Sequence, residues 1–216
     1  MVNAGGIVSY RGHRHRPTVL IQIAQWEDRA GLWARWIMLE TGSLLIASPG
    51  MHEVTFDRTV IFVIEHDNQG SMGLVLNRPS DMLVSDALPD FGQLADPDRL
   101  YVGGPVEQGT ALVLAEPLDP AAPDMHFMHD GIGLLDLAAE RDPRLHLERA
   151  RVFSGYTGWG PRQLETELRS GAWIIGRSEP GDLWACDSQN MWARVLARQG
   201  TMEDFLLSYP EQPWLN

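Results

Sequence analysis

Residues 153–165 have the sequence FSGYTGWGPRQLE, and the rest of the chain is organised around this stretch. A strand predicted at 150–153 leads into it. Its three glycines permit positive φ angles or close approach of the backbone to a neighbour. Pro161 suits the first position of a helix, because its missing N–H would have no helical partner there. The pattern therefore predicts a strand, a glycine-rich corner and a helix over 161–170.

The length and composition indicate a globular protein without a transmembrane helix. A chain of 216 residues is long enough for one domain with a buried core and a tail. The sequence contains no run of 18 apolar residues, so no transmembrane helix is predicted. The N-terminus lacks the order of regions that is typical of a signal peptide. The single cysteine, Cys186, excludes an internal disulfide, so we expect a cytoplasmic protein.

The charged residues exclude several kinds of chemistry. All 17 basic side chains are arginine, and the absence of lysine excludes Schiff-base catalysis, pyridoxal phosphate anchoring and a P-loop lysine. The net charge of −12 does not favour nucleic-acid binding, which depends on clustered Lys and Arg. Residues 1–40 carry five arginines against three acidic residues, so they are locally basic and the remainder is more acidic still.

Residues 1–40 differ from the rest and are predicted to form a partly disordered N-terminal extension. The stretch RGHRHR at 11–16 is typical of a mobile tail. Apolar residues then recur at spacings of three and four over 23–37, which predicts an amphipathic helix. That helix could bind a membrane surface or a partner, or it could dock on its own domain. Alternatively, residues 1–37 lie upstream of a true start at Met38.

Residues 41–209 are predicted to form one α+β domain, followed by a C-terminal tail at 210–216. Strands and helices mix without strict βαβ alternation. We expect residues 60–64, a continuous apolar run, to be covered on both faces and to form a hairpin with 72–76 through a long loop. The other expected strands are 44–47, 100–102, 111–115, 126–128, 131–135, 150–153, 173–175 and 183–185. The expected helices are 82–88, 136–140, 161–170, 188–199 and a capped segment at 201–207, with an irregular loop at 116–123.

The glycine-rich stretch has two interpretations. A strand, a glycine turn and a helix can present free N–H groups to an anion, and Arg162 would reinforce such a site. The alternative is a tight structural corner in which Tyr156 and Trp159 fill a core pocket. Without a phosphate-binding lysine or a Gly-x-Gly-x-x-Gly pattern, the structural interpretation is favoured.

A second polar group lies at the predicted hairpin. His66 could act as a general base oriented by a carboxylate, with Glu65 and Asp67 beside it. Neighbouring strand residues point to opposite faces, however, so Glu65 and His66 cannot serve one site if the strand continues. Arg78 could bind an anion, or it could pair with Glu65 or Asp67.

The remaining motifs do not require a metal, a cofactor or a covalent intermediate. His126, His129 and Asp130 would converge only on a helix, whereas the local pattern is extended. Gly-x-Ser-x-Gly is absent, and Cys186 follows a short apolar run, where an inert buried thiol is the usual case. We therefore predict no metal and no cofactor, and nothing in the sequence requires an enzyme.

Several short motifs together resemble the YqgE/AlgH family of bacterial proteins. They are GSLLIASP at 42–49, FDRTVI at 56–61, EH at 65–66, GLVLNRP at 73–79, GGPV at 103–106, GYTGWG at 155–160 and QLE at 163–165. The resemblance runs from about residue 41 to 207. Thr157 stands where the family usually has Ala, and Pro161-Arg162 replaces a common pair of small residues.

The resemblance implies a single α+β domain with a mixed, barrel-like or bifurcated β-sheet flanked by helices. The family is often labelled as transcriptional regulators, but it implies no shared catalytic residue, ligand or DNA-binding element. Our leading hypothesis is a cytoplasmic, non-enzymatic module that binds a small ligand or a partner protein and has a regulatory role. The candidate ligand-binding residues are Glu65, His66, Asn77, Arg78, Gly103, Gly104, Tyr156, Trp159, Gln163 and Glu165.

Two other functions are retained as alternatives. One is a hydrolase or transferase that uses His66 with Glu65, Asp67 or Glu165. The other is direct DNA binding, which the acidic domain does not favour.

Overall fold

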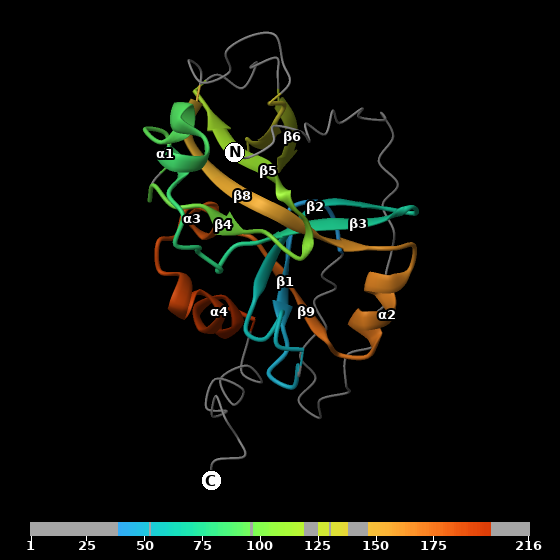
Figure 1. Cartoon of the computed structure of the whole chain (residues 1–216). Coiled ribbons are helices and arrows are strands. Elements are labelled where there is room, and N and C mark those ends of the chain that lie inside the picture. Colours follow the sequence, from blue (N-terminus) through green and yellow to red (C-terminus); the bar gives the residue numbers. More distant parts are fainter. Residues whose placement is uncertain are drawn as a thin grey trace.

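The computed structural model describes residues 39–51, 53–95, 97–118, 125–129, 131–137 and 147–199 (Figure 1). The predictions for residues 1–38, for 138–140, for the segment at 201–207 and for the C-terminal tail lie outside these residues. No helix within the described ranges is long and apolar enough to cross a membrane.

One mixed sheet dominates the fold. Its strands follow the order β6-β7-β5-β8-β3-β2-β1-β9, with neighbours antiparallel, and β4 pairs with β8 in parallel off this path. The path begins at β6 and ends at β9, so it does not close. The strands are β1 (Ser43–Ala47), β2 (Val60–Asp67), β3 (Gly70–Val75), β4 (Tyr101–Val102), β5 (Val106–Pro117), β6 (Met125–His129), β7 (Ile132–Leu135), β8 (Leu147–Trp159) and β9 (Trp173–Arg177).

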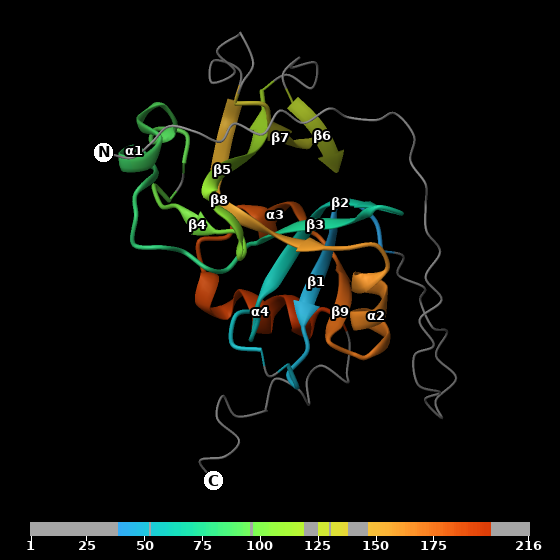
Figure 2. The ribbon, with the colours of Figure 1, turned by 45° about the vertical axis from the view of Figure 1, so that its right-hand side comes forward.

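Short helices flank the sheet, which confirms the α+β class. They are α1 (Val84–Ala87), the 3-10 turn η1 (Pro89–Phe91), α2 (Gln163–Arg169), α3 (Pro180–Leu183) and α4 (Ser188–Ala197). Figure 2 shows α2 and α4 on opposite sides of β1 and β9.

The two helices bury alternate residues of the central strands. Phe62 packs in the cluster that contains the apolar side of α4, whereas Ile61 and Val63 pack with Leu164 and Leu168 of α2. All three strand residues are fully buried. The continuous apolar run at 60–64 therefore forms a strand covered on both faces, as predicted.

The fold differs from the prediction most clearly at β8. Residues 153–159 do not leave the sheet in a corner, because β8 continues as a strand to Trp159. Residues 147–156 of β8 pair with β5, and residues 157–159 pair with β3. Gly155, with φ +68°, lies where the strand passes from one partner to the other. The glycines therefore bend a strand instead of ending it.

The start of α2 also differs from the prediction. The helix begins at Gln163 and not at Pro161, because Arg162 takes the left-handed conformation with φ 62°. Pro161 lies in the turn between β8 and α2.

Glycines on two segments allow the backbones to cross closely. A Cβ placed on Gly103 would lie 2.2 Å from the carbonyl oxygen of Gly155, and one on Gly155 would lie 2.6 Å from the carbonyl oxygen of Val106. Both distances are shorter than any normal contact. Hydrogen bonds fill the crossing: Gly103 N–H donates to Ser154 O, and Val75 N–H donates to Gly103 O, each at 2.9 Å. The connection from β4 to β5 is thereby joined to β8.

Two local predictions were wrong. The β2–β3 hairpin is tight, because Asp67 pairs with Gly70 and its Oδ1 accepts the N–H groups of Gln69 at 2.7 Å and Gly70 at 3.2 Å. The expected strand at 183–185 is absent, because Leu183 is the last residue of α3. Helix α4 matches its prediction: Asp187 Oδ1 caps it by accepting Asn190 N–H at 3.2 Å.

The glycine crossing predicts a contrast between two substitutions. We expect Gly103→Ala to lower the free energy of unfolding by about 1–3 kcal/mol, because the new methyl group overlaps the β8 backbone. Gly109→Ala is the matched control, since a Cβ there meets no atom within 4 Å. Urea unfolding of both variants measures the difference. Equal stabilities would show that the crossing tolerates a side chain.

Candidate functional site

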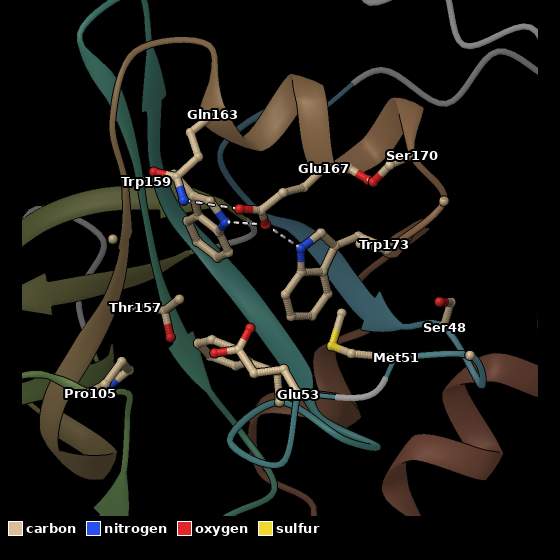
Figure 3. A pocket seen from close by; sticks show the side chains of 15 residues that line it. Ser48, Met51, Glu53, Pro105, Thr157, Trp159, Gln163, Glu167, Ser170 and Trp173 are labelled. Atoms are coloured by element: carbon tan, nitrogen blue, oxygen red, sulfur yellow. Dashed lines mark hydrogen bonds between the residues drawn. The ribbon is translucent and has the colours of Figure 1, made fainter.

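A groove of about 680 Å³ lies beside α2, between this helix and the loop that follows β1 (Figure 3). The end of β8 and the start of β9 form its floor. Its lining residues are Ser48, Gly50, Met51, Glu53, Phe56, Pro105, Thr157, Gly158, Trp159, Gln163, Glu167, Ser170, Gly171, Ala172 and Trp173.

Three aromatic rings line the groove. Trp159 ends β8 and Trp173 begins β9, and their ring centroids lie 6.0 Å apart at 83°. Phe56 packs against Trp173 in the same edge-to-face manner, with centroids 5.6 Å apart at 71°. Edge-to-face pairs of this kind add stability beyond the area they bury. Both indoles are mostly buried, at 6% and 4% exposure, so their positions are set by the core.

The Glu167 carboxylate links these elements. Its Oε2 accepts the indole N–H of Trp159 and that of Trp173, each at 2.8 Å. Its Oε1 accepts the Nε2–H of Gln163, one helical turn earlier, at 2.9 Å. A buried indole N–H needs an acceptor, and here one carboxylate serves two of them (Figure 3). The polar side of the groove is thus held in one arrangement before any ligand enters.

Backbone N–H groups of the turn that leads into α2, which the alternative interpretation would offer to an anion, have partners within the chain. Gly160 N–H donates to Gln163 Oε1 at 3.1 Å, and Gln163 N–H donates to Gly160 O at 3.1 Å. Thr166 N–H donates to Arg162 O at 3.2 Å. The charged residues that line the groove are Glu53 and Glu167, both acidic. The lining therefore favours neither phosphate nor carboxylate ligands.

Of the candidate residues, Trp159 and Gln163 line this groove. Asn77 instead holds the start of β2: its Oδ1 accepts Val60 N–H at 3.0 Å and its Nδ2 donates to Arg58 O at 2.8 Å. Arg78 donates to the backbone carbonyl of Asp57. Burial lowers the pKa of Arg78, and the negative charge of Asp57 opposes that shift.

Gly103, Gly104 and Tyr156 belong to the glycine crossing. A Cβ on Gly104 would lie 2.2 Å from the backbone of Tyr156, so Gly104 is also required by packing. Burial raises the pKa of the Tyr156 phenol, and Glu107 adds to the effect. Of this region, Pro105 and Thr157 reach the groove.

Glu65, His66 and Glu165 lie away from the lining of the groove. His66 Nδ1 is 2.7 Å from Ser71 Oγ across the β2–β3 hairpin, and its Nε2 is buried with no hydrogen-bond partner in the described part of the chain. Burial lowers the pKa of His66, while Glu165 and Asp67 act to raise it. Burial, with a smaller effect of Asp67, raises the pKa of Glu65.

Sequence reasoning missed Glu53, Glu167 and Trp173 as parts of a site. Glu167 could have been found, because it lies four residues after Gln163 on the same helix face. Trp173 carried no such signal, since its contact with Trp159 arises only when β8 and β9 fold onto α2.

Two further expectations concern metals and the thiol. Within the described ranges, no group of three or more His, Cys, Asp and Glu residues is placed to hold a metal ion. Cys186 is exposed, which corrects the expectation of a buried thiol, because it follows α3 and a turn instead of a strand.

Comparisons with known proteins place this geometry in context. A family model described as AlgH-like matches residues 44–203. The chain is 42% identical over 185 residues to a UPF0301 protein of Streptomyces avermitilis, covering 82% of this chain and 95% of that protein. It is 36% identical over 190 residues to a UPF0301 protein of Thermobifida fusca, with the same coverage of 82% and 95%.

Two solved structures share the fold. A crystal structure of protein DIP2367 from Corynebacterium diphtheriae matches with a TM-score of 0.73 and 27% identity, covering 80% of this chain and 94% of that one. The solution structure of the AlgH protein from Pseudomonas aeruginosa matches with a TM-score of 0.59 and 28% identity, covering 79% and 94%.

The shared carboxylate predicts the effect of a conservative change. Glu167→Gln places an amide NH2 among N–H donors, so at least one donor loses its acceptor. We expect the free energy of unfolding to fall by about 1–3 kcal/mol. Glu165→Gln, on the same helix, is the matched control and should change stability by less than about 0.5 kcal/mol. Urea unfolding gives the stabilities, and equal losses in the two variants would contradict the network.

The buried ring of His66 predicts a pH dependence of stability. Its folded pKa lies below the ordinary value of 6.5, which the unfolded chain regains. The stability that the neutral ring contributes is therefore present above about pH 6.5 and is lost as the pH falls toward the folded pKa. Between about pH 7.5 and about pH 5.5, the wild-type protein should lose more unfolding free energy than His66→Gln. Equal losses of unfolding free energy in the two proteins over this pH range would contradict the assignment of the pH dependence to His66.

Proposed function

The chain belongs to the AlgH-like family, and we propose that it is a non-enzymatic binding module whose ligand occupies the groove beside α2. The observation that carries this proposal is the prepared lining, in which Glu167 is held by two indoles and Gln163. Ligand sites are usually preformed, mostly apolar clefts of roughly 300–1,000 Å³ with a few fixed polar groups. The groove, at about 680 Å³, lies within that range of volume, and its lining combines aromatic rings with fixed polar groups.

The polar groups of the groove support binding more than catalysis. Ser170 Oγ donates to Glu167 O at 2.8 Å, and Thr157 Oγ1 donates to Gly103 O at 3.3 Å. These hydroxyls are directed at backbone carbonyls and not at a general base. The carboxylate of Glu167 accepts three N–H groups, so it serves to position side chains more readily than to take a proton.

The alternative is a hydrolase or transferase that uses His66. The contact between His66 Nδ1 and Ser71 Oγ at 2.7 Å and the nearby charge of Glu165 favour it. Ser71 is only 8% exposed, however, and a nucleophile must reach its substrate. The groove is therefore the better supported site.

We propose a cytoplasmic location and a regulatory output for the module. The single cysteine fits a reducing compartment, and the net charge of −12 favours a small ligand or a protein partner over direct contact with DNA. Ligand occupancy of the groove could be transmitted through α2, because Gln163 and Glu167 join this helix to two strands.

A fragment screen tests the proposed function. A library of neutral, anionic and cationic metabolites is added to ¹⁵N-labelled protein, and the indole N–H resonances of Trp159 and Trp173 are followed. We expect at least one compound to shift both resonances. Gln163→Ala should weaken the binding of that compound about 2- to 10-fold, because one hydrogen bond that fixes Glu167 is lost.

Arg78→Ala is the control for this experiment, because Arg78 lies outside the groove lining. It should leave the affinity unchanged. The proposal fails if no library compound shifts the two resonances, or if the shifts are equally sensitive to both substitutions.

A further inference from the structure

The groove lining combines negative charge with aromatic rings. Its charged residues, Glu53 and Glu167, are both carboxylates, and three aromatic rings accompany them. Figure 3 shows Glu53 on the side of the groove opposite Gln163 and Glu167. A ligand that enters therefore meets negative charge from two directions, in a protein whose net charge is −12. Such a field concentrates cations.

We propose that the ligand of this groove carries an organic cation, an ammonium or guanidinium group. This inference rests on the proposed binding function and names the chemical class of the ligand. The cationic group would lie between Glu53 and Glu167, beside the aromatic rings that line the groove.

Glu167 retains the capacity to accept one such donor. Each carboxylate oxygen can accept two hydrogen bonds. The Oε2 atom already accepts two indole N–H groups, whereas Oε1 accepts one N–H, from Gln163. Oε1 therefore has one position open to a charged N–H of the ligand, and its direction is fixed by the existing network. Bonds of this charge-assisted kind are about twice as strong as neutral ones.

The aromatic rings suit the same ligand. A cation is attracted to the face of an aromatic ring, and tryptophan is the best partner. The fold uses this contact elsewhere: the guanidinium of Arg58 lies 5.0 Å from the ring centroid of Trp192, and that of Arg149 lies 4.7 Å from Trp184. In the groove, the rings and carboxylates come from this chain, and the lining includes no Arg or Lys. Among the residues that the structure describes, no cationic side chain lines the groove, which supports a ligand that brings its own positive charge.

A bare divalent metal ion fits the lining less well. Calcium requires six to eight oxygen ligands, and magnesium requires near-octahedral oxygen geometry. Two of the four acceptor positions of Glu167 point at indole N–H groups and a third at Gln163. An organic cation needs only one or two acceptors and uses the apolar surface as well.

The inference is tested with a matched pair of probes. Nα-acetyl-arginine amide (hereafter arginine amide) carries a guanidinium as its only charge, and Nα-acetyl-citrulline amide (hereafter citrulline amide) replaces it with a neutral urea group of nearly the same shape. Titration into ¹⁵N-labelled full-length protein, followed through the indole N–H resonances of Trp159 and Trp173, should give at least tenfold tighter binding of arginine amide.

Glu53→Gln removes one carboxylate without disturbing the core, because Glu53 is exposed. It should weaken the binding of arginine amide about 2- to 5-fold, as expected for a partly solvated ion pair. The affinity for citrulline amide should stay unchanged. Binding of arginine amide should also weaken as salt is raised.

The outcomes separate the two proposals. If citrulline amide binds as tightly as arginine amide, or if only neutral or anionic library compounds shift the indole resonances, the cationic inference is overturned and the binding function stands. If no compound of any charge shifts them, both proposals fail.

Discussion

The fold depends on the close crossing of two backbones, where Gly103 lies against Gly155. With a Cβ on Gly103 only 2.2 Å from the Gly155 carbonyl oxygen, no other residue type fits without displacing a strand. The crossing allows β8 to pair with β5 along its first part, to contact β4 beside the crossing, and then to pair with β3. One strand thereby joins the two halves of the sheet. Without the close approach, β8 would have to end at the bend, and the hydrogen-bonding groups of β3 at residues 71–73 would lack their present partners.

The groove is a consequence of that continuous strand. Because β8 extends to Trp159, this indole reaches the face of the sheet that α2 covers, where it meets Trp173 of β9. The turn after Trp159 is short, so α2 begins at once and places Glu167 above both indoles. Strand, helix and neighbouring strand are tied through one carboxylate. A change in the position of α2 would break hydrogen bonds to both strands, which gives the groove a rigid polar side.

The parts of the fold that were predictable are those with a local cause. Residues 60–64 are apolar without interruption and rich in β-branched side chains, and they form a strand buried on both faces. Asp187 and the apolar stripe of α4 likewise specify that helix from within it. The prediction of a corner at 153–159 was wrong, because glycines that permit a turn also permit two backbones to lie in contact. Which of the two occurs depends on Gly103, which is distant in the sequence. For the site, Trp159 and Gln163 were identified from the motif they belong to. Glu167 was missed although it lies one helical turn after Gln163, and Trp173 could not be identified because its contact with Trp159 forms only when β8 and β9 fold onto α2.

The turn after β8 is closed by its own hydrogen bonds, which supports the favoured structural interpretation over the alternative of an anion site. An anion site at a strand–helix junction needs backbone N–H groups that point away from the chain and lack partners. Here Gly160 N–H is satisfied by the side chain of Gln163, and Gln163 N–H by Gly160 O, so the turn closes on itself. What lines the groove beside the turn is a carboxylate together with largely buried aromatic rings. This surface has few free hydrogen-bond donors and has carboxylate acceptors. It therefore complements a ligand that brings its own N–H groups and positive charge.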